Sequence, residues 1–393
     1  MTRSQIKDFL RTNPGYLKWG PLKLAAKLGV PINKVKQCLK DIKQELSYPK
    51  RQLSNEPENK ILNNPDENLV LRSRWYNGKE WCESFRNVDL PLDLLTKEDW
   101  IDVMSTINTV KPVYSINKPE KQCDKTLIIW SSDKHIGAAI PSDALYKRHY
   151  DKHIFHERMV QIYNEAVRYF NLHGAFEELI IADLGDSLDG FNGLTTRGGH
   201  HLPQNLNNKE AARVHFFTHK WFYDSLILFG IAKKIRIVNI TNDNHAGDFG
   251  YQCNFALSQY GSLAWPNIEF INIEEFIGHI EIYERAYILT HGKDKKNRSR
   301  PLPLRINAET ESFLMDYVID RGLGNKKIHV RKGDIHLNDL DCSRKKMSYW
   351  NIGSVFGSSD WIMDNFSDTV PSCVFEVVEK GANHLDSKIL WLE

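Results

Sequence analysis

The strongest constraint on the fold of this chain is a set of five short apolar runs, each followed closely by Asp, Asn or His. The runs span residues 127–130, 179–182, 235–240, 287–290 and 327–330. Short apolar runs bounded by turn-forming residues are typical of strands buried inside a sheet. The polar residues that follow them include Asp133, His135, Asp186, Asn244, His245, His291, Asp334 and His336. The sequence therefore predicts an α/β protein with polar side chains at its strand ends.

The repetition of this pattern favours one shared site. A single Asp or Asn after a strand is usually a turn or cap residue, and a single His is more often a core residue. In open α/β sheets, however, ligands bind beyond the carboxyl ends of the strands, where residues distant in sequence converge. Carboxylate, amide and imidazole groups suit Mn²⁺, Fe or Zn²⁺, and the lack of thiolates among them disfavours a structural zinc site.

The same residues carry a resemblance to a known family. From about Thr126 to Glu393 the chain resembles the calcineurin-like metallophosphoesterases, whose motifs are Asp-x-His, Gly-Asp-x-x-Asp, Gly-Asn-His, a His and Gly-His-x-His. The matching segments here are Asp133-Lys-His135, Gly185-Asp-Ser-Leu-Asp189, Asp243-Asn-His245, His291 and Gly333-Asp-Ile-His336. The resemblance implies a four-layer αββα sandwich and the hydrolysis of phosphate esters.

The resemblance also implies a role for each matching residue. A first divalent metal ion would be held by Asp133, His135, Asp186 and His336. A second would be held by Asp186, Asn244 and His291, with Asp186 bridging. His245 would be the acid or electrostatic partner of the reacting phosphate. Two ions roughly 3.5 to 4 Å apart activate a water and stabilise the leaving oxygen of an in-line displacement. Mn²⁺ is the expected metal, with Fe, Zn²⁺ and Mg²⁺ as alternatives.

The chain departs from the family motifs at two positions. Asp334 stands where the family usually has the first His of its last motif, and we expect it to bind the second metal. Asp243 stands where the third motif normally has Gly, and the backbone there is expected to need an unusual turn, which Asp tolerates better than most residues. Asp189 is expected to be structural, capping the segment that follows it.

Two loops next to predicted ligands are candidates for substrate contacts. Residues 191–204 form a glycine-rich loop after the second motif, so Arg197, His200 and His201 are predicted to touch substrate phosphates. The alternative is a surface loop with incidental histidines. Residues 293–300 form a basic run after His291, which could contact a phosphate backbone.

The N-terminal segment differs from the rest of the chain in charge. Residues 1–50 hold eleven Lys or Arg against three acidic residues, a net charge of +8, which leaves −6 for the remainder of a chain whose total is +2. Helices are predicted at 5–12, 21–29 and 32–46 from their apolar spacing. The stretch 24–39 resembles helix-turn-helix and winged-helix families, although many such modules bind protein. The predicted DNA contacts are Asn33, Lys34, Lys36, Gln37 and Lys40.

These patterns divide the chain into a basic module at 1–47, a linker and packing segment at 48–124 and a catalytic domain at 125–393. Within the middle segment we predict a polar linker to about residue 68, a hairpin at 72–88 and a helix at 92–110. The longest apolar stretch, at 225–232, is far shorter than the ~20 residues of a membrane helix. Six scattered cysteines favour reduced thiols, and we expect a cytoplasmic protein.

The leading functional hypothesis is a metal-dependent phosphodiesterase that acts on DNA, most similar to the DNA-repair exonuclease branch of the superfamily. Ser/Thr phosphatases of this superfamily continue the second motif with Arg-Gly, whereas Gly190 and Phe191 follow Asp189 here. One alternative is a phosphatase or a cyclic-nucleotide phosphodiesterase whose basic module binds protein. Another is a catalytically impaired DNA-binding protein that has lost a metal through Asp334. Association as a homodimer or with a partner protein stays open.

Overall fold

A computed structural model describes residues 2–12, 21–47, 69–76, 81–87, 113–115, 121–146, 149–296, 300–365 and 369–393 of the 393-residue chain. Internal contacts divide the chain into two units, residues 1–89 and 90–393. The predicted linker at 48–68 and the predicted helix at 92–110 lie outside the described residues. Among the helices that are described, none has the length and apolar character needed to cross a membrane.

Three helices open the first unit, as the apolar spacing predicts: α1 (Arg3–Thr12), α2 (Pro21–Leu28) and α3 (Ile32–Ser47). Their apolar faces form a small core that includes Leu10, Leu24 and Val35. Gly29 joins α2 to α3 with a φ of 62°, a left-handed conformation that glycine adopts without steric cost. The predicted DNA contacts on α3, which are Asn33, Lys34, Lys36, Gln37 and Lys40, are all exposed.

The predicted hairpin of the first unit is confirmed. Strands β1 (Leu69–Tyr76) and β2 (Trp81–Asn87) pair antiparallel, with Tyr76 opposite Trp81.

Two sheets form the centre of the second unit. The first has the strand order β13-β12-β3-β4-β5-β6. Its parallel strands are β3 (Gln122–Ser131), β4 (Ala175–Asp183), β5 (Ala232–Ile240) and β6 (Ile268–Ile273). An antiparallel pair, β12 (Ser372–Glu379) and β13 (Asp386–Trp391), extends it beyond β3.

The second sheet has the order β10-β11-β9-β8-β7. Its strands are β7 (Gly278–Ile282), β8 (Arg285–Thr290), β9 (Lys327–Lys332), β10 (Asp339–Asp341) and β11 (Met347–Asn351). Strands β8, β9 and β11 run parallel, and antiparallel strands lie at both edges.

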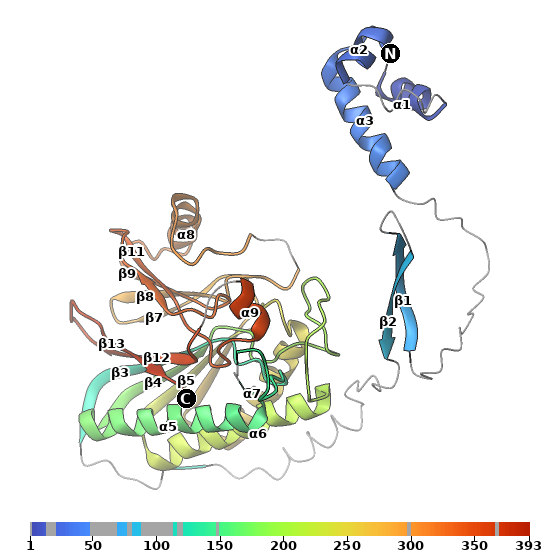
Figure 1. Ribbon diagram of the computed structural model, residues 1–393. Helices are drawn as coiled ribbons and strands as arrows, with labels where there is room; N and C mark the ends of the chain where they lie inside the picture. The colour runs from blue at the N-terminus through green and yellow to red at the C-terminus, as the bar shows by residue number, and fades with distance from the viewer. Residues whose placement is uncertain are drawn as a thin grey trace. The chain divides into compact units, whose positions relative to one another are not determined.

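Helices cover the outer faces of the two sheets, which gives the predicted four-layer αββα sandwich. Figure 1 shows α5 (Lys152–His173) and α6 (Asn208–Phe229) side by side across the first sheet, in the layer that also contains α7 (Asp248–Ala264). Helix α8 (Ala308–Asp320) packs on the second sheet, and a short helix, α9 (Asp360–Asn365), precedes β12 in the chain.

The alternation of side chains along β3 explains the layers. Leu127 and Ile129 point to the helical layer, whereas Ile128 and Trp130 point to the second sheet. Because successive side chains of a strand face opposite sides, an uninterrupted apolar run must be covered on both faces. The apolar runs of the sequence therefore required a covering layer on each side of the sheet.

A buried ion pair lies between the two sheets. The Arg331 guanidinium contacts the Glu376 carboxylate at 3.0 Å, and their side chains are 1% and 0% exposed. Trp130 Nε1 and Tyr287 Oη also donate to this carboxylate, at 2.9 and 2.7 Å. The guanidinium also lies within cation–π distance of the rings of Trp130, Tyr287 and Trp350. The carboxylate is thus fully partnered, as a buried charge requires.

Candidate metal centre

The backbone at the strand ends is strained where the predicted ligands lie. Among the described residues, seven other than glycine have positive φ angles, and five of these are predicted ligands. The five are Asp133 (51°), His135 (45°), Asp186 (49°), Asp334 (73°) and His336 (63°). Such conformations cost on the order of 1 to 3 kcal/mol each and cluster at functional sites. Their concentration at the ends of β3, β4 and β9 marks this edge of the sheets as the functional one.

Two glycines allow the ligand loops to approach one another. A Cβ on Gly333 would lie 1.9 Å from Ser132 Oγ, and one on Gly185 would lie 2.8 Å from His291 Nδ1. Both separations are far below van der Waals contact, so neither position accepts a side chain without movement of its neighbours. The loops after β3, β4, β8 and β9 consequently converge.

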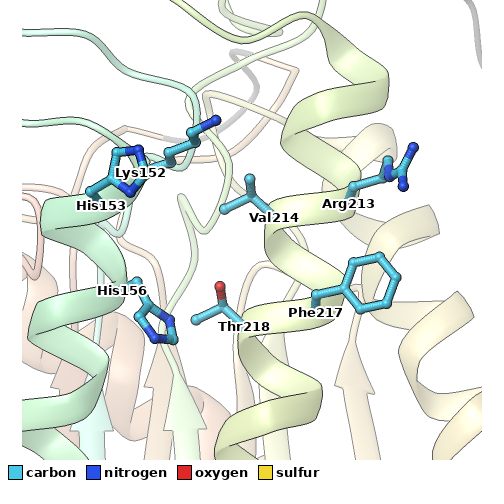
Figure 2. Close-up of a pocket in the computed structure, with 7 residues that line it drawn as sticks. All are labelled: Lys152, His153, His156, Arg213, Val214, Phe217 and Thr218. Atoms are coloured by element: carbon cyan, nitrogen blue, oxygen red, sulfur yellow. The ribbon is translucent and has the colours of Figure 1, made fainter.

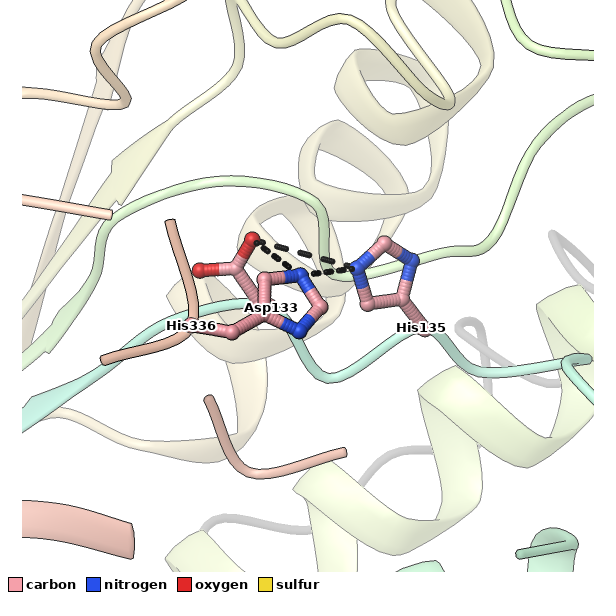
Figure 3. A group of neighbouring side chains, drawn as sticks. All are labelled: Asp133, His135 and His336. Atoms are coloured by element: carbon pink, nitrogen blue, oxygen red, sulfur yellow. Dashed lines mark hydrogen bonds and ion pairs between the residues drawn. The ribbon is translucent and has the colours of Figure 1, made fainter. Parts of the chain in front are cut away.

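The first group of ligands consists of Asp133, His135 and His336 (Figure 3). The His135 and His336 Nε2 atoms lie 3.3 Å apart, and His336 Nε2 lies 3.3 Å from Asp133 Oδ1. All three side chains are buried. Asp133 Oδ1 has no hydrogen-bond partner among the described residues. A buried carboxylate oxygen without a partner is costly unless a cation or proton occupies the space beside it.

The opposite ring nitrogens of these histidines determine their tautomers. His135 Nδ1 lies 3.0 Å from Asp189 Oδ1, and His336 Nδ1 lies 2.7 Å from the Gly357 carbonyl oxygen. Both oxygens accept only, so each Nδ1 carries a hydrogen, and in the neutral rings both Nε2 atoms present lone pairs. Two lone pairs that face one another at 3.3 Å repel unless a positive charge lies between them. The arrangement fits a metal ion.

The electrostatics favour positive charge at the same place. Burial lowers the pKa of His135, but the nearby carboxylates of Asp133 and Asp189 outweigh it and raise that pKa to about 10. Burial raises the pKa of Asp133, yet the neighbouring imidazole of His336 brings it well below the usual range. The group therefore stabilises a proton or a cation between its nitrogens and its carboxylate.

A second group surrounds His291. Its Nε2 lies 3.1 Å from Asp186 Oδ2, 3.1 Å from Asn244 Oδ1 and 4.0 Å from Asp334 Oδ1. Its Nδ1 lies 2.8 Å from the Leu184 carbonyl oxygen, so Nδ1 donates and Nε2 faces the three oxygens. The structure thus brings together all seven predicted metal ligands.

The two groups meet at Asp133. The ligand atoms of Asp133, His135 and His336 lie close enough together to bind one metal ion. The same holds for those of Asp133, Asp186 and His291. The family resemblance predicted that Asp186 bridges the two metal ions, and that role stays a prediction. Asp133 is the side chain that lies within reach of both groups.

His245 lies at the edge of the second group and is more accessible than the ligands. Its Nδ1 lies 2.8 Å from the Asp189 carbonyl oxygen, and its Nε2 lies 3.8 Å from Asp186 Oδ2. Its side chain is 19% exposed, compared with 3% for His135 and 0% for His291. Burial lowers the pKa of His245, but the Asp186 carboxylate raises it above the ordinary value overall. His245 can therefore hold a proton close to solvent.

Asp189 has a different role from the predicted helix or turn cap. Its Oδ1 accepts from His135 Nδ1, and its Oδ2 accepts from Gln204 Nε2 at 3.1 Å. Its backbone carbonyl accepts from His245 Nδ1. Asp189 consequently orients two histidines of the centre. The prediction missed this because the direction of its side chain depends on the loop conformation.

Asp243 also differs from the expectation of an unusual turn, since it is not among the residues with positive φ. Its Oδ1 accepts from the backbone N–H groups of Ala246 and Gly247, at 3.0 and 2.9 Å. Its Oδ2 accepts from the Asp186 N–H at 3.2 Å. Burial, followed by the nearby Asp186 charge, raises the pKa of Asp243 to about 7. The carboxylate joins the second and third ligand loops.

The glycine-rich loop at 191–204 is hydrogen-bonded to the third motif. Arg197 N–H donates to the Asn244 carbonyl oxygen at 3.0 Å, and Arg197 Nη1 lies 3.1 Å from Asp294 Oδ1. His200 and His201 are exposed and belong to none of the ligand groups found among the described residues. The substrate contacts predicted for Arg197, His200 and His201 stay predictions.

Sequence reasoning missed a buried ion pair beneath the ligand loops. Lys134, which lies between two predicted ligands, places its Nζ 2.6 Å from Asp183 Oδ2 at the end of β4, with side chains 4% and 8% exposed. Tyr150 Oη donates to the Lys134 carbonyl oxygen. The pair joins the first ligand loop to the second.

A separate hollow on the helical layer contains none of these ligands. It lies between α5 and α6 and is lined by Lys152, His153, His156, Arg213, Val214, Phe217 and Thr218 (Figure 2).

No family model matches the chain, and no curated protein does. Solved structures similar to this chain include two proteins of known name. One is a double mutant of Vps29 from Entamoeba histolytica, with 14% identity and a TM-score of 0.29 over 68% of this chain and 99% of that protein. The other is 5'-nucleotidase from Candida albicans, with 10% identity and a TM-score of 0.34 over 72% of this chain. The chain matches 54%, about half, of that nucleotidase.

Proposed function

We propose that this chain is a metal-dependent phosphoesterase of the calcineurin-like type. The observation that carries the proposal is the 3.3 Å approach of the His135 and His336 Nε2 atoms beside Asp133 Oδ1, which has no hydrogen-bond partner among the described residues. A divalent cation is the species that these three atoms suit together. The second group, around His291, has the donor atoms for another.

Several residues of the chain would have distinct roles in such a reaction. Divalent ions in a pair of this kind supply the charge that activates a water and stabilises a leaving oxygen. Asp189 holds His135 in the tautomer that leaves Nε2 free. His245 is held through Nδ1 and its side chain is 19% exposed, so its Nε2 can deliver a proton to a leaving oxygen.

We propose DNA as the substrate and phosphodiester cleavage, that is, a nuclease activity, as the reaction. The basic first fifty residues and the exposed side chains of Asn33, Lys34, Lys36, Gln37 and Lys40 support a polyanionic partner. Arg197, His200 and His201 supply further cationic or proton-donating groups on the loop that is hydrogen-bonded to Asn244.

The test is hydrolysis, with Mn²⁺, of end-labelled single- and double-stranded DNA beside nitrophenyl phosphate. We expect cleavage of DNA. His245→Ala should lower kcat by about 10² to 10⁴-fold with Mn²⁺ still bound, and Asp186→Asn, which removes a charge from the centre, should lower activity and weaken metal binding. His156→Ala, at an exposed histidine on α5, is the matched control and should retain full activity. Cleavage of the monoester alone would favour the phosphatase alternative. Full activity of Asp186→Asn would refute the metal centre.

A further inference from the structure

The two ligand groups differ in the atoms that they offer. Asp133, His135 and His336 present two imidazole nitrogens and one carboxylate oxygen. His291 presents one nitrogen, and the side chains within 4.0 Å of it, Asp186, Asn244 and Asp334, present oxygens. The first position is therefore rich in nitrogen and the second is rich in oxygen.

Each group has the dimensions of one coordination sphere. Ligands about 2.1 Å from a single ion lie roughly 3.0 to 3.4 Å from their neighbours and roughly 4.2 Å from an opposite ligand. In the first group the separations are 3.3, 3.3 and 3.8 Å. In the second group the separations from His291 Nε2 are 3.1, 3.1 and 4.0 Å. The 4.0 Å separation of Asp334 Oδ1 from His291 Nε2 is thus compatible with both side chains holding one ion.

Asp334 is built into this position by its backbone. Its N–H donates to Asp133 Oδ2 at 3.2 Å, and its φ of 73° turns the chain sharply after Gly333. Its side chain is only 13% exposed, and its nearest cation is Lys293, whose Nζ lies 3.9 Å from Oδ1. The carboxylate has no shorter ionic partner among the described residues, which leaves its oxygens available to a metal ion.

We infer that Asp334 makes the second position selective for hard cations such as Mn²⁺ and Mg²⁺, which bind there more weakly and exchange faster than the ion of the first position. Carboxylate and carbonyl oxygens suit Mg²⁺ and Mn²⁺, whereas imidazole suits Zn²⁺ and Fe. The inference rests on the proposed function, because it assigns different metals to the two positions of that centre. If this inference holds, both metal positions are occupied only when a hard cation such as Mn²⁺ or Mg²⁺ is available.

The test uses the full chain, freed of metal by a chelator and titrated with Mn²⁺ by calorimetry. Pulsed electron paramagnetic resonance then counts the ¹⁴N nuclei coupled to each ion. We expect two binding events that differ at least tenfold in Kd, with two imidazole nitrogens at the tighter ion and one at the weaker. Zn²⁺ should bind at the first position and bind more weakly at the second.

Asp334→His should add a nitrogen to the weaker ion and tighten its binding of Zn²⁺ at least tenfold. Histidine accepts the left-handed backbone at this position, since His135 and His336 already adopt it. Asp334→Asn, which keeps an oxygen donor but removes the charge, should weaken Mn²⁺ at the second position only. Asp320→His, on the exposed end of α8, is the matched control and should change neither event.

Several results would overturn the inference. Equal affinities in the unsubstituted chain, two nitrogens at both ions, or unchanged titrations in both Asp334 variants would each do so while leaving a two-metal centre intact. A chain that binds no Mn²⁺ at all would instead refute the metal centre, and with it the proposed function.

Discussion

Replacing Lys134 with Met tests how much of the stability of this chain depends on the ion pair beneath the ligand loops. The substitution keeps most of the apolar volume but leaves the Asp183 carboxylate, whose side chain is 8% exposed, without its cation. Asp183 Oδ1 already lacks a hydrogen-bond partner among the described residues, so no other group can take over. Breaking a buried ion pair in this way costs about 3 to 5 kcal/mol.

The chain contains a matched comparison at its surface. Lys233 Nζ lies 2.6 Å from Glu177 Oε2, the same separation as in the buried pair, but these side chains are 46% and 50% exposed. Lys233→Met should therefore change the free energy of unfolding very little, since water solvates the remaining carboxylate. The two variants differ in burial and not in ion-pair length.

Urea unfolding of both variants, followed by tryptophan fluorescence, measures the difference. Lys134→Met should lower the midpoint clearly without a change in slope, and Lys134→Met combined with Asp183→Leu should recover most of the loss, because it removes the isolated charge. If Lys134→Met costs no more than Lys233→Met, the buried pair does not hold the two ligand loops together, and the reasoning fails.

Three further predictions concern other parts of the molecule. Glu376→Gln should destabilise the chain by about 3 to 5 kcal/mol at pH 7, because it leaves Arg331 buried without a counter-charge. Burial raises the pKa of Glu376, but Arg331 lowers it below its usual 4.5 overall, so the stabilisation is present above pH 4.5 and is lost on acidification. In urea unfolding, the difference in unfolding free energy between the unsubstituted chain and the variant should therefore be smaller below pH 4 than at pH 7. Adding Mn²⁺ at a hundredfold excess over Kd should stabilise the metal-free chain by about 2.7 kcal/mol per bound ion, and calorimetric melting that shows no shift would contradict the centre. Replacing Lys34, Lys36 and Lys40 with Ala should weaken DNA binding and reduce the slope of log K against log salt by up to about 2.7; an unchanged slope would exclude α3 from the interface.

Local patterns in the sequence predicted strands that are buried on both faces, whereas the four-layer arrangement and the individual ligand assignments came from the family resemblance. Apolar runs such as 127–130 required cover on both faces, and parallel strands bring their carboxyl ends to one edge. Asp133, His135 and His291 could thus be placed at one site before any coordinates were known.

Other features depend on tertiary geometry and could not be predicted. The side chain of Asp189 turns toward His135 because of the conformation of a loop, and the ion pair of Lys134 requires knowledge of which strand lies beside β3. Asp133, which belongs to both ligand groups, has a left-handed backbone; Asp tolerates that conformation, but local sequence does not say at which Asp it occurs. Spacing in the sequence predicts which residues lie at the same site, whereas backbone dihedral angles determine which of their atoms are in contact.

The left-handed backbone at the ligands has a consequence for how this centre should be studied by mutagenesis. Alanine has no stabilising interaction to offset a φ near 50°, so an alanine scan would add a backbone penalty on the order of 1 kcal/mol to the effect of losing a donor atom. Asn in place of Asp186 or Asp334 avoids that penalty, and Gly in place of His135 or His336 would even relieve it. Such a glycine variant should unfold at a higher urea concentration than the unsubstituted chain when no metal is present, although it binds no metal. The difference in unfolding free energy would measure the stability cost of holding the ligands in place.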